Sequence, residues 1–514
     1  MNARTRSLAA SGLVLGAAVL AWVALPAAAQ TITVPAGGDL QVAIDRARPG
    51  DTVTLAPGAV YTGNFVLPAN DGDQFITIRT ADDARHPRAG QRVRPALAGS
   101  LAVLRSPGRA PALRTAPGAH HWRLTLLELA ANQDAAGDIL ALGDGGLAQH
   151  ALSAVPHDLI VDRCYIHGDP ERGQKRAIAL NSGSTTISNS YISDIKAVGQ
   201  DSQAIAGWNG PGPYTIENNY LEAAGDNFLL GGADPAIRGL TAQDVVFRRN
   251  HLTKRLEWRT AGWQVKNLFE LKNARRVLVE GNVMENVWKD AQAGYAILLT
   301  PRNQDGGAPW VAVEDVTIRR NLVRHAGGGI AITGEDSNHP SGSTRRVMVT
   351  GNLFYDIDAA AWGGSGAFLL IGNGPADVSI EHNTVAQSGN ILTAFGGSRG
   401  EPLPIRGLIF QNNLIRHNEF GVIGSDQAVG TGTLDAYFPG AVFRSNTIGG
   451  GDASRYPSGN TFIDRSAFDE GFLDPGHGDF RVKPGAAARG TASDGTNAGA
   501  DLPALAAAVG ARLR

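Results

Sequence analysis

The sequence predicts an all-β rod in which one chain winds through about ten or more stacked coils, a single-stranded parallel β-helix. Glycine accounts for 65 of the 514 residues and aromatic residues for only 6%, which favours a turn-rich β protein. A short pattern also returns about every thirty residues. Each copy holds two or three short strands, which cannot fold alone and are therefore expected to stack on their neighbours.

The repeated pattern is an apolar pair with a polar residue between, then an Asn-class residue and a second apolar pair, as in VLVEGNVM and VTIRRNLV. Its alternation is typical of a strand. An asparagine at one bend can bond the backbone of the next coil and tolerates the left-handed conformation, so a ladder is expected. The ladder positions are spaced by 26 to 39 residues and are Cys164, Ser190, Asn219, Asn250, Asn282, Asn321, Asn352, Asn383, Asn413 and Asn446.

Residues 1–29 are typical of a signal peptide. Two arginines precede an apolar run, and small residues at Ala27 and Ala29 suit cleavage after Ala29. The alternative is an uncleaved membrane anchor. No other segment approaches the ~20 apolar residues of a membrane-spanning helix, so we expect a secreted or periplasmic protein with no stable membrane span after cleavage. The single cysteine, Cys164, cannot form an internal disulfide.

The remainder is expected to form the β-helix over residues 30–479, followed by a closing segment and tail over 480–514. Near the start, Asp39 would cap a short amphipathic helix over residues 40–47, which would cover the open end of the first coil. Residues 80–119 have weak periodicity, and the sequence does not place them on the rod.

The opening GGDLQVAIDRARPGDTVTLAPGAVYTGNFVLP, the repeats and the tail DPGHGDFRVKPGAAARG resemble the right-handed parallel β-helix proteins of the pectin-lyase-like superfamily. The resemblance covers about residues 36–479 and is to the secreted, polysaccharide-active type, with no subfamily matched. It implies a right-handed helix and a polysaccharide as substrate or ligand, but no catalytic residue. A β-propeller would need blades of ~40–45 residues, longer than these repeats.

One strand departs from the repeat. Glu270 and Lys272 alternate with Phe269 and Leu271, where the equivalent strands carry small or apolar residues. Because alternate residues of a strand share a face, Phe269 is expected inside. Glu270 and Lys272 are then expected to face solvent on the floor of a shallow groove. The alternative is a plain surface ion pair, worth under ~1 kcal/mol.

Other polar and aromatic residues fall in the same few coils, on long turns that would form the walls of a cleft. Tryptophan suits the apolar face of a sugar ring, and Arg or Lys suits its carboxylate. The alternatives are that the tryptophans pack the turns onto the rod and that the aspartates cap turns. The expected substrate-binding residues are Trp208, Asn209, Asp226, Asp234, Trp258, Trp263, Lys266, Trp288 and Asn303.

The leading hypothesis is a lyase that cleaves an acidic, uronate-containing glycan by β-elimination. A base removes the proton next to the carboxylate, and a cation neutralises that carboxylate. Lys272 is the expected base, because burial or nearby positive charge can lower the pKa of a lysine. Arg302 or Lys266 would hold the carboxylate. Glu270 would orient Lys272 or bind a cation.

Two other functions are compatible with these residues. A glycoside hydrolase needs two carboxyls about 5–9.5 Å apart, which Glu270 could form with Asp226 or Asp234. A non-catalytic glycan-binding or cell-surface protein would use the groove without turnover. The formal net charge of −2 does not suggest nucleic acid as a partner. No cofactor is certain, although the oxygens of these three acids would suit Ca²⁺, without a diagnostic spacing.

Overall fold

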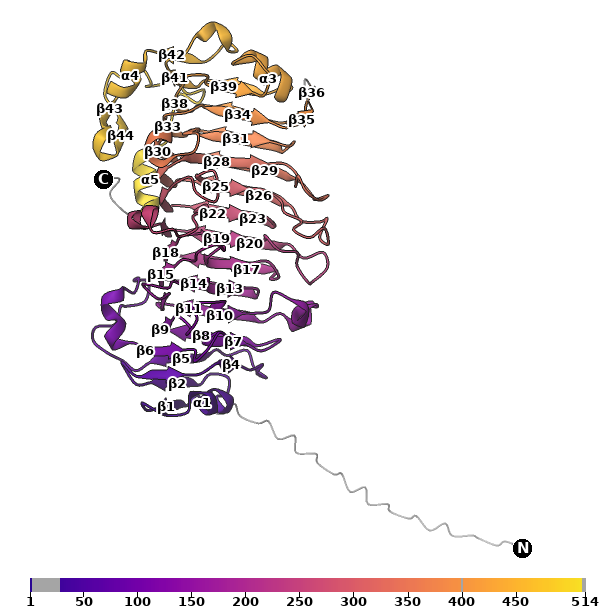
Figure 1. Ribbon diagram of the computed structural model, residues 1–514, viewed down its shortest axis with the longest axis vertical. Helices are drawn as coiled ribbons and strands as arrows, with labels where there is room; N and C mark the ends of the chain where they lie inside the picture. The colour runs from indigo at the N-terminus through magenta and orange to yellow at the C-terminus, as the bar shows by residue number, and fades with distance from the viewer. Residues whose placement is uncertain (2–27, 399–400, 511–514) are drawn as a thin grey trace.

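The protein is a right-handed parallel β-helix, as the sequence predicts (Figure 1). The structure is a computed structural model that describes Met1, residues 28–398 and residues 401–510. Three long parallel sheets, here called A, B and C, contain 14, 14 and 12 strands. The expected signal peptide falls almost wholly outside the described residues. Within the described part of the chain, no helix has the length and apolarity needed to span a membrane.

Successive coils add one strand to each sheet. Sheet A consists of β1 (Thr31–Val34), β2 (Thr52–Leu55), β5 (Ile76–Thr80), β8 (His120–Thr125), β11 (His157–Asp162), β14 (Gly183–Ser188), β17 (Gly212–Glu217), β20 (Ala242–Arg248), β23 (Ala274–Glu280), β26 (Val313–Arg319), β29 (Thr344–Thr350), β32 (Ala376–Glu381), β37 (Ile409–Gln411) and β40 (Val442–Arg444). Sheet B consists of β3 (Val60–Thr62), β6 (Ala102–Arg105), β9 (Leu127–Ala130), β12 (Tyr165–His167), β15 (Tyr191–Ile195), β18 (Tyr220–Ala223), β21 (His251–Thr253), β24 (Val283–Val287), β27 (Leu322–Ala326), β30 (Leu353–Ile357), β33 (Thr384–Gln387), β38 (Leu414–Arg416), β41 (Thr447–Gly449) and β42 (Thr461–Ile463). Sheet C consists of β4 (Phe65–Leu67), β7 (Leu113–Thr115), β10 (Asp138–Leu142), β13 (Arg176–Leu180), β16 (Gln203–Gly207), β19 (Asp226–Leu230), β22 (Phe269–Leu271), β25 (Tyr295–Leu299), β28 (Gly328–Thr333), β31 (Leu369–Gly372), β34 (Leu392–Phe395) and β39 (Val422–Gly424).

The remaining elements lie at the ends and turns of the rod. They are the helices α1 (Leu40–Arg46), α2 (Ala359–Trp362), α3 (Thr431–Tyr437), α4 (Arg465–Glu470) and α5 (Leu502–Val509), and the short antiparallel pairs β35 (Gly397–Ser398) with β36 (Glu401–Pro402) and β43 (Phe472–Asp474) with β44 (Asp479–Val482). Asp39 caps α1 by accepting a hydrogen bond from the backbone N–H of Val42. α1 covers one end of the rod (Figure 1), with Leu40, Ala43 and Ile44 buried.

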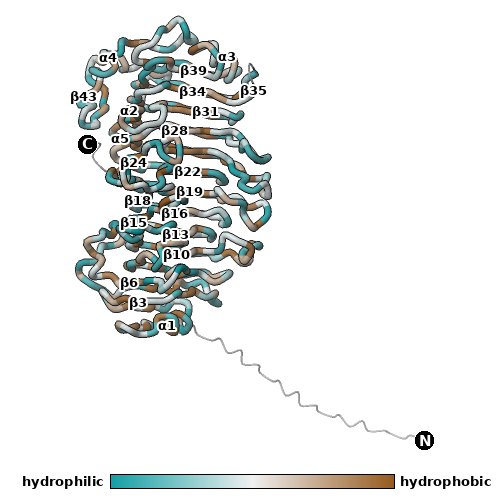
Figure 2. Tube along the Cα trace, viewed as in Figure 1, coloured by the Kyte–Doolittle hydropathy of each residue, from teal (hydrophilic) through white to brown (hydrophobic). Residues whose placement is uncertain are grey.

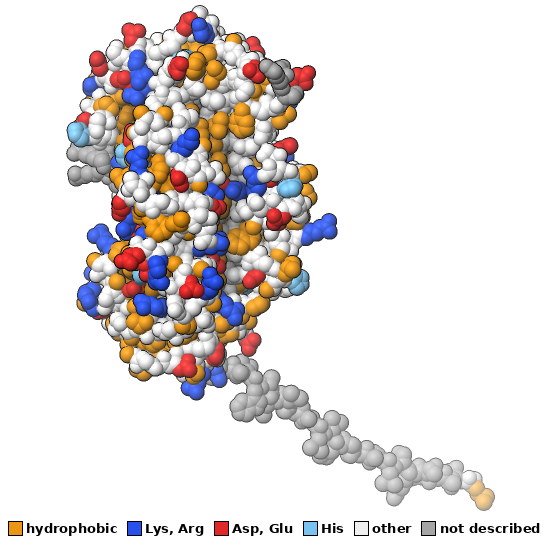
Figure 3. All heavy atoms as spheres, viewed as in Figure 1, with side chains coloured by type: hydrophobic (Ala, Val, Ile, Leu, Met, Phe, Trp, Pro, Cys, Tyr) orange, Lys and Arg blue, Asp and Glu red, His pale blue; other side chains and the backbone are white. Residues whose placement is uncertain are grey.

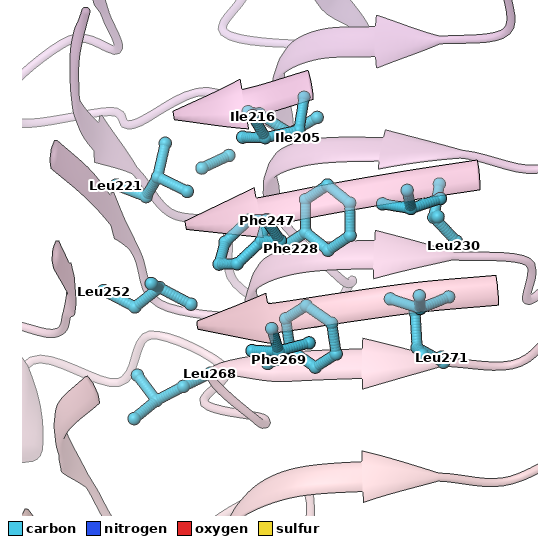
Figure 4. Packing of buried hydrophobic residues seen from close by; sticks show 14 of the residues in the cluster. Ile205, Ile216, Leu221, Phe228, Leu230, Phe247, Leu252, Leu268, Phe269 and Leu271 are labelled. Carbon is cyan, nitrogen blue, oxygen red and sulfur yellow. The ribbon is translucent and has the colours of Figure 1, made fainter. Parts of the chain in front are cut away.

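Apolar side chains from all three sheets fill the interior as one continuous file. At its centre, the rings of Phe228 and Phe269 stack with centroids 5.4 Å apart, and Phe247 from sheet A lies 4.6 Å from Phe228 (Figure 4). Hydrophobic and hydrophilic residues alternate along the strands, as expected for strands with one face in the interior (Figure 2). Burial of this file supplies the main driving force for stacking.

A ladder of buried asparagines joins sheets A and B, as the repeat predicts. In each step the side-chain carbonyl accepts the backbone N–H of the preceding ladder residue. Asn282 N–H donates to Asn321 Oδ1 at 2.9 Å, and Asn321 N–H donates to Asn352 Oδ1 at 2.9 Å. Each side-chain amide also donates to a backbone carbonyl, as Asn321 Nδ2 does to Val279. Asn460 adds a step that the sequence pattern does not reveal.

The left-handed conformation is not taken by the ladder residues themselves, contrary to the expectation. The residue before each one takes it: φ is +55° at Arg249, +52° at Arg320 and +65° at both Gly281 and Gly351. The ladder asparagine can then point inward, where both ends of its amide are satisfied.

Residues 80–119, which the sequence left unplaced, leave the rod and return to it. After β5 the chain makes an excursion, defined here as residues 81–101, and returns at β6. The excursion packs on the outside of sheet B. The backbone N–H of Val93 donates to Asn189 O, and Val93 and Leu101 are buried with Leu126.

The C-terminal tail also folds back along sheet B. α5 and the preceding segment bury apolar residues such as Leu502 and Leu505 against outward-facing Leu322 and Leu353. α5 therefore ends about halfway along the rod, beside the excursion from the N-terminal half (Figure 1).

Replacement of Asn321 by Ala tests the ladder. The Asn282 N–H and the Val279 carbonyl would lose buried partners, each costing about 1–3 kcal/mol. The free energy of unfolding, measured by urea denaturation, is expected to fall by at least about 2 kcal/mol. The exposed Asn338→Ala is the control, and equal losses for the two variants would contradict the role of the ladder.

Candidate functional site

The candidate site lies on the outer wall of sheet C, where β19 and β22 are adjacent. Their register pairs Phe228 with Phe269 and Leu229 with Glu270. Because the two phenylalanines point inward, Leu229 and Glu270 point away from the interior. On the other side of Glu270 the paired residue is Leu298. A carboxylate thus stands between two leucines on this wall.

Glu270 points outward but is not exposed, so the expectation that it faces solvent is wrong. Its side chain is 0% accessible because neighbouring groups cover it. Lys272 Nζ lies 3.0 Å from Glu270 Oε1, and Asn267 Nδ2 lies 3.4 Å from Oε2. Lys272 is itself only 14% exposed and lies against the turn at Gly231 and Gly232. Alternation predicts direction, but not how deeply neighbours bury a side chain.

Asp226, at the start of β19, lies beside Glu270 and is fully buried. Neither of its carboxyl oxygens has an N–H or hydroxyl donor. Burial and the negative charge of Glu270 raise the pKa of Asp226 well above its ordinary value, against the pull of Lys266 and Lys272. The direction of this shift favours the protonated form of Asp226, in which its hydroxyl can donate a hydrogen bond to Glu270.

Glu270 is the ionised member of this pair. Burial alone would raise its pKa, but the Lys272 ammonium, the hydrogen bond from Asp226 and the charge of Lys266 together lower the pKa of Glu270 below its ordinary value. The result is a buried chain of three groups, acid, carboxylate and ammonium, across two coils. Titratable groups with such displaced pKa values gather at functional sites.

Two more lysines flank this chain. Lys266 Nζ donates to Asp201 Oδ2 at 2.7 Å. Burial lowers the pKa of Lys266, but Asp226 and Asp201 outweigh it and the net shift is upward. Lys254 is fully buried, and its ammonium donates to four oxygens, including Asn227 Oδ1 at 2.9 Å. Burial lowers the pKa of Lys254 to about 7, although Asp226 opposes the shift.

Arg302 follows β25 and lies close to Lys272, whose carbonyl accepts the Arg302 backbone N–H at 3.2 Å. The guanidinium is 22% exposed and pairs with the buried carboxylate of Asp336 at 2.8 Å. Asn303 and Asp234 do not reach the site. Both hold the long turn after β25: Asn303 is fully buried and donates to Pro340 O, and Asp234 accepts the N–H groups of residues 305 and 307.

The tryptophans of these coils pack against one another instead of lining the groove. Trp258 and Trp288 are buried with Trp362 in a separate apolar cluster, and Trp263 packs on it. Arg259 also covers two of them, 5.8 Å from the ring of Trp288 and 5.1 Å from that of Trp362. The proposed sugar-stacking faces of Trp258 and Trp288 are therefore occupied, which favours the packing alternative.

Trp208 and Asn209 lie on a turn two coils before Glu270. Trp208 is half-buried, with Arg176 4.9 Å above its ring and its Nε1 donating to Gly145 O. Asn209 is fully buried and donates to Asp144 O and Gln149 O. Asn209 therefore shapes a turn and does not contact the groove.

The structure thus unites Asp226, Lys266, Glu270 and Lys272, with Arg302 beside them. Sequence reasoning missed Lys254, although the clustering of four lysines in residues 254–289 was a signal for it. Among the described residues, no group of three or more His, Cys, Asp or Glu side chains is placed to hold a metal ion. The oxygen donors suggested for Ca²⁺ do not gather, because Asp234 serves the turn.

Comparison with known proteins supports the fold. No protein-family model and no curated protein sequence matches the chain. A solved PL6-family alginate lyase, AlyGC, aligns with 14% identity and a TM-score of 0.52, covering 84% of this chain and 53% of that one. A mannuronic acid-specific polysaccharide family 6 lyase from human gut microbiota aligns with 13% identity and a TM-score of 0.50, covering 86% and 93%. The chain thus spans about half the length of AlyGC.

Asp226→Asn tests the shared proton. A carboxyl with a raised folded-state pKa gives stability that is fully present below its unfolded pKa and is lost as pH rises through the folded pKa. Asn donates the same hydrogen bond without ionising. Relative to the wild type, the variant's free energy of unfolding is expected to rise as the pH increases above about 4, by up to about 1.4 kcal/mol per pH unit.

Chemical denaturation across this pH range measures the difference. The exposed Asp305→Asn is the matched control and should show no pH-dependent gain. An Asp226→Asn profile parallel to that of the wild type would show that Asp226 ionises normally.

Proposed function

We propose that the protein is a polysaccharide lyase that cleaves an acidic, uronate-containing glycan at the outer wall of sheet C. The observation that carries the proposal is the buried chain Asp226–Glu270–Lys272, in which Glu270 stands where the adjacent strands of sheet C carry Leu229 and Leu298. Even a paired buried charge often stabilises a fold no better than apolar residues of similar volume would. The buried ion pair is therefore weak evidence for a purely structural role. The lyase folds of the two solved structures above support the reaction class by analogy only.

The cations of the site are more accessible than the acids Asp226 and Glu270. Lys272 and Arg302 are 14% and 22% exposed, and Lys266 is 10% exposed beside its more exposed partner Asp201. Basic and acidic side chains mix across the middle of this face (Figure 3). A uronate carboxylate would therefore meet positive charge first, which suits its neutralisation before proton abstraction.

In the proposed reaction, Lys266 and Arg302 hold the carboxylate. Glu270 orients Lys272, whose Nζ lies 3.0 Å from Oε1, and Lys272, as the neutral amine, takes the proton from C5 of the uronate. The C4–O4 bond breaks as the C4=C5 double bond forms, and Lys272 returns the proton to the departing O4. Asp226 stabilises Glu270 throughout by its hydrogen bond.

A glycoside hydrolase is not favoured. Its two carboxyls must stand about 5–9.5 Å apart to act on opposite sides of the bond. Asp226 and Glu270 are both fully buried and lie close enough for the charge of Glu270 to raise the pKa of Asp226, and Asp234 is occupied by the turn after β25. A glycan-binding protein without turnover would keep the same cationic surface, so activity alone distinguishes it from a lyase.

Incubation with a panel of uronate and neutral glycans tests the proposal. Uronate glycans are expected to yield unsaturated products that absorb near 235 nm. Lys272→Ala and Glu270→Gln should each lower the rate at least about 100-fold, because general acid–base groups contribute about 10²–10⁴-fold. Lys289→Ala removes an exposed lysine on a neighbouring turn and should retain full activity.

Binding of uronate glycans without any rise in absorbance or reducing ends would overturn the lyase and leave the binding protein. Reducing ends without absorbance at 235 nm would instead restore the hydrolase.

A further inference from the structure

A second polar pocket lies on the outer face of sheet B. It has a volume of about 860 Å³. It is bounded by the excursion, by the sheet B strands β21, β24 and β27, and by the end of α5. In Figure 1 the N-terminal excursion and α5 both lie along the left side of the rod, and the space-filling view of Figure 3 shows an indentation there. It is separate from the Glu270 site, since none of its lining residues belongs to sheet C.

The lining of this pocket is strongly basic. Five arginines contribute to it, and no Asp or Glu is among the described residues that line it. Basic side chains are also visible around the indentation in Figure 3. The arginines are Arg85, Arg92, Arg94, Arg249 and Arg324.

Three of these arginines are balanced by acids just outside the lining. Arg85 pairs with Asp83 at 2.6 Å, and Arg249 pairs with Glu217. Arg324 pairs with Glu285 at 2.6 Å, and the same carboxylate also accepts a hydrogen bond from His251. These acids hold the arginine side chains in place but leave the pocket surface to the cations.

Arg92 and Arg94 have no such balance. Arg92 donates to Asn218 O at 2.8 Å and to Asn218 Oδ1 at 3.1 Å, both of which are uncharged acceptors. It is half-buried, and burial lowers the pKa of Arg92 to about 10. Arg94 is exposed at the start of a short 3₁₀ turn. A partly buried cation without a counter-charge is stabilised when an anion binds beside it.

An aromatic row on sheet B leads into the pocket. The rings of Tyr191 and Tyr220 stack with centroids 4.2 Å apart, and His251, which lines the pocket, lies 5.1 Å from Tyr220. All three are half-buried. Aromatic faces beside arginines match the apolar face and the carboxylate of an acidic sugar.

We propose that this pocket is a second binding site for an acidic saccharide, in which Arg92 and Arg94 hold a uronate carboxylate. Its volume falls within the range of about 300–1,000 Å³ that is typical of small-molecule sites. The inference shares its ligand class with the proposed function but requires no catalysis. It gives the protein a second contact with glycan, on a different wall of the rod from the Glu270 site.

The test is hydrogen–deuterium exchange of the whole mature protein, carrying Glu270→Gln to prevent cleavage, with mannuronate, guluronate and galacturonate hexasaccharides. At least one of them is expected to protect peptides covering residues 85–97 and 505–510, whereas a neutral hexasaccharide does not. Arg94→Ala, which removes an exposed side chain, and Arg92→Gln should each weaken the protection about tenfold in ligand concentration. Arg88→Ala, in the same loop but outside the pocket, should have no effect.

Protection by none of the acidic hexasaccharides, or equal protection by the neutral one, would overturn the proposal. Protection by inorganic phosphate alone would also overturn it and would indicate a phosphate-bearing ligand. If the pocket is protected but no glycan is cleaved by the wild type, the second site stands and the lyase fails. If the wild type cleaves a glycan but the pocket is not protected, the lyase stands and the second site fails.

Discussion

The structure depends on one constraint: the backbone N–H and C=O groups of each coil must form hydrogen bonds with the coils above and below it. The asparagine ladder is where this constraint is strictest, because each amide serves two neighbours and has no access to water. Extra residues are therefore excluded from the stack. The longest interval, from Asn282 to Asn321, keeps its ladder hydrogen bond and places its additional residues in the turn that carries Arg302.

The same constraint explains the cost of the candidate site. A charged group on the wall of sheet C is close to strands on both sides, so it loses much of its contact with water. The protein limits that cost in two ways. The raised pKa of Asp226 favours its neutral form, and Glu270 is paired with Lys272. The buried acids thus lie beneath the more accessible Lys272 and Arg302, a polarity suited to an anionic ligand.

Sequence reasoning succeeded where one interaction repeats and failed where distant segments meet. The period of the asparagines predicted the coils and the ladder, and alternation predicted that Glu270 points outward. Its burial depends on Lys272 and on adjoining coils, which alternation does not describe. The tryptophans Trp258, Trp263 and Trp288 were expected in the same few coils. Their partner Trp362 comes from a later coil, so the sequence did not predict that they pack against one another. The pocket on sheet B joins residues 85–97 with residues 509–510, which are more than 400 residues apart in the sequence.

Coil stacking also determines how an extended ligand can be recognised on sheet C. Side chains at equivalent positions recur with the strand spacing of about 4.8 Å, so a polymer along the axis meets a new coil at each step. Toward the N-terminus from the Glu270 site, the equivalent positions on consecutive strands hold Asp138, Arg176, Gln203 and Asp226. Arg176 bonds to Asp138 at 2.8 Å and to Gln203 at 3.0 Å. This fixed polar row continues the wall beyond the buried acid pair, so the polar surface of sheet C is longer than the proposed site itself.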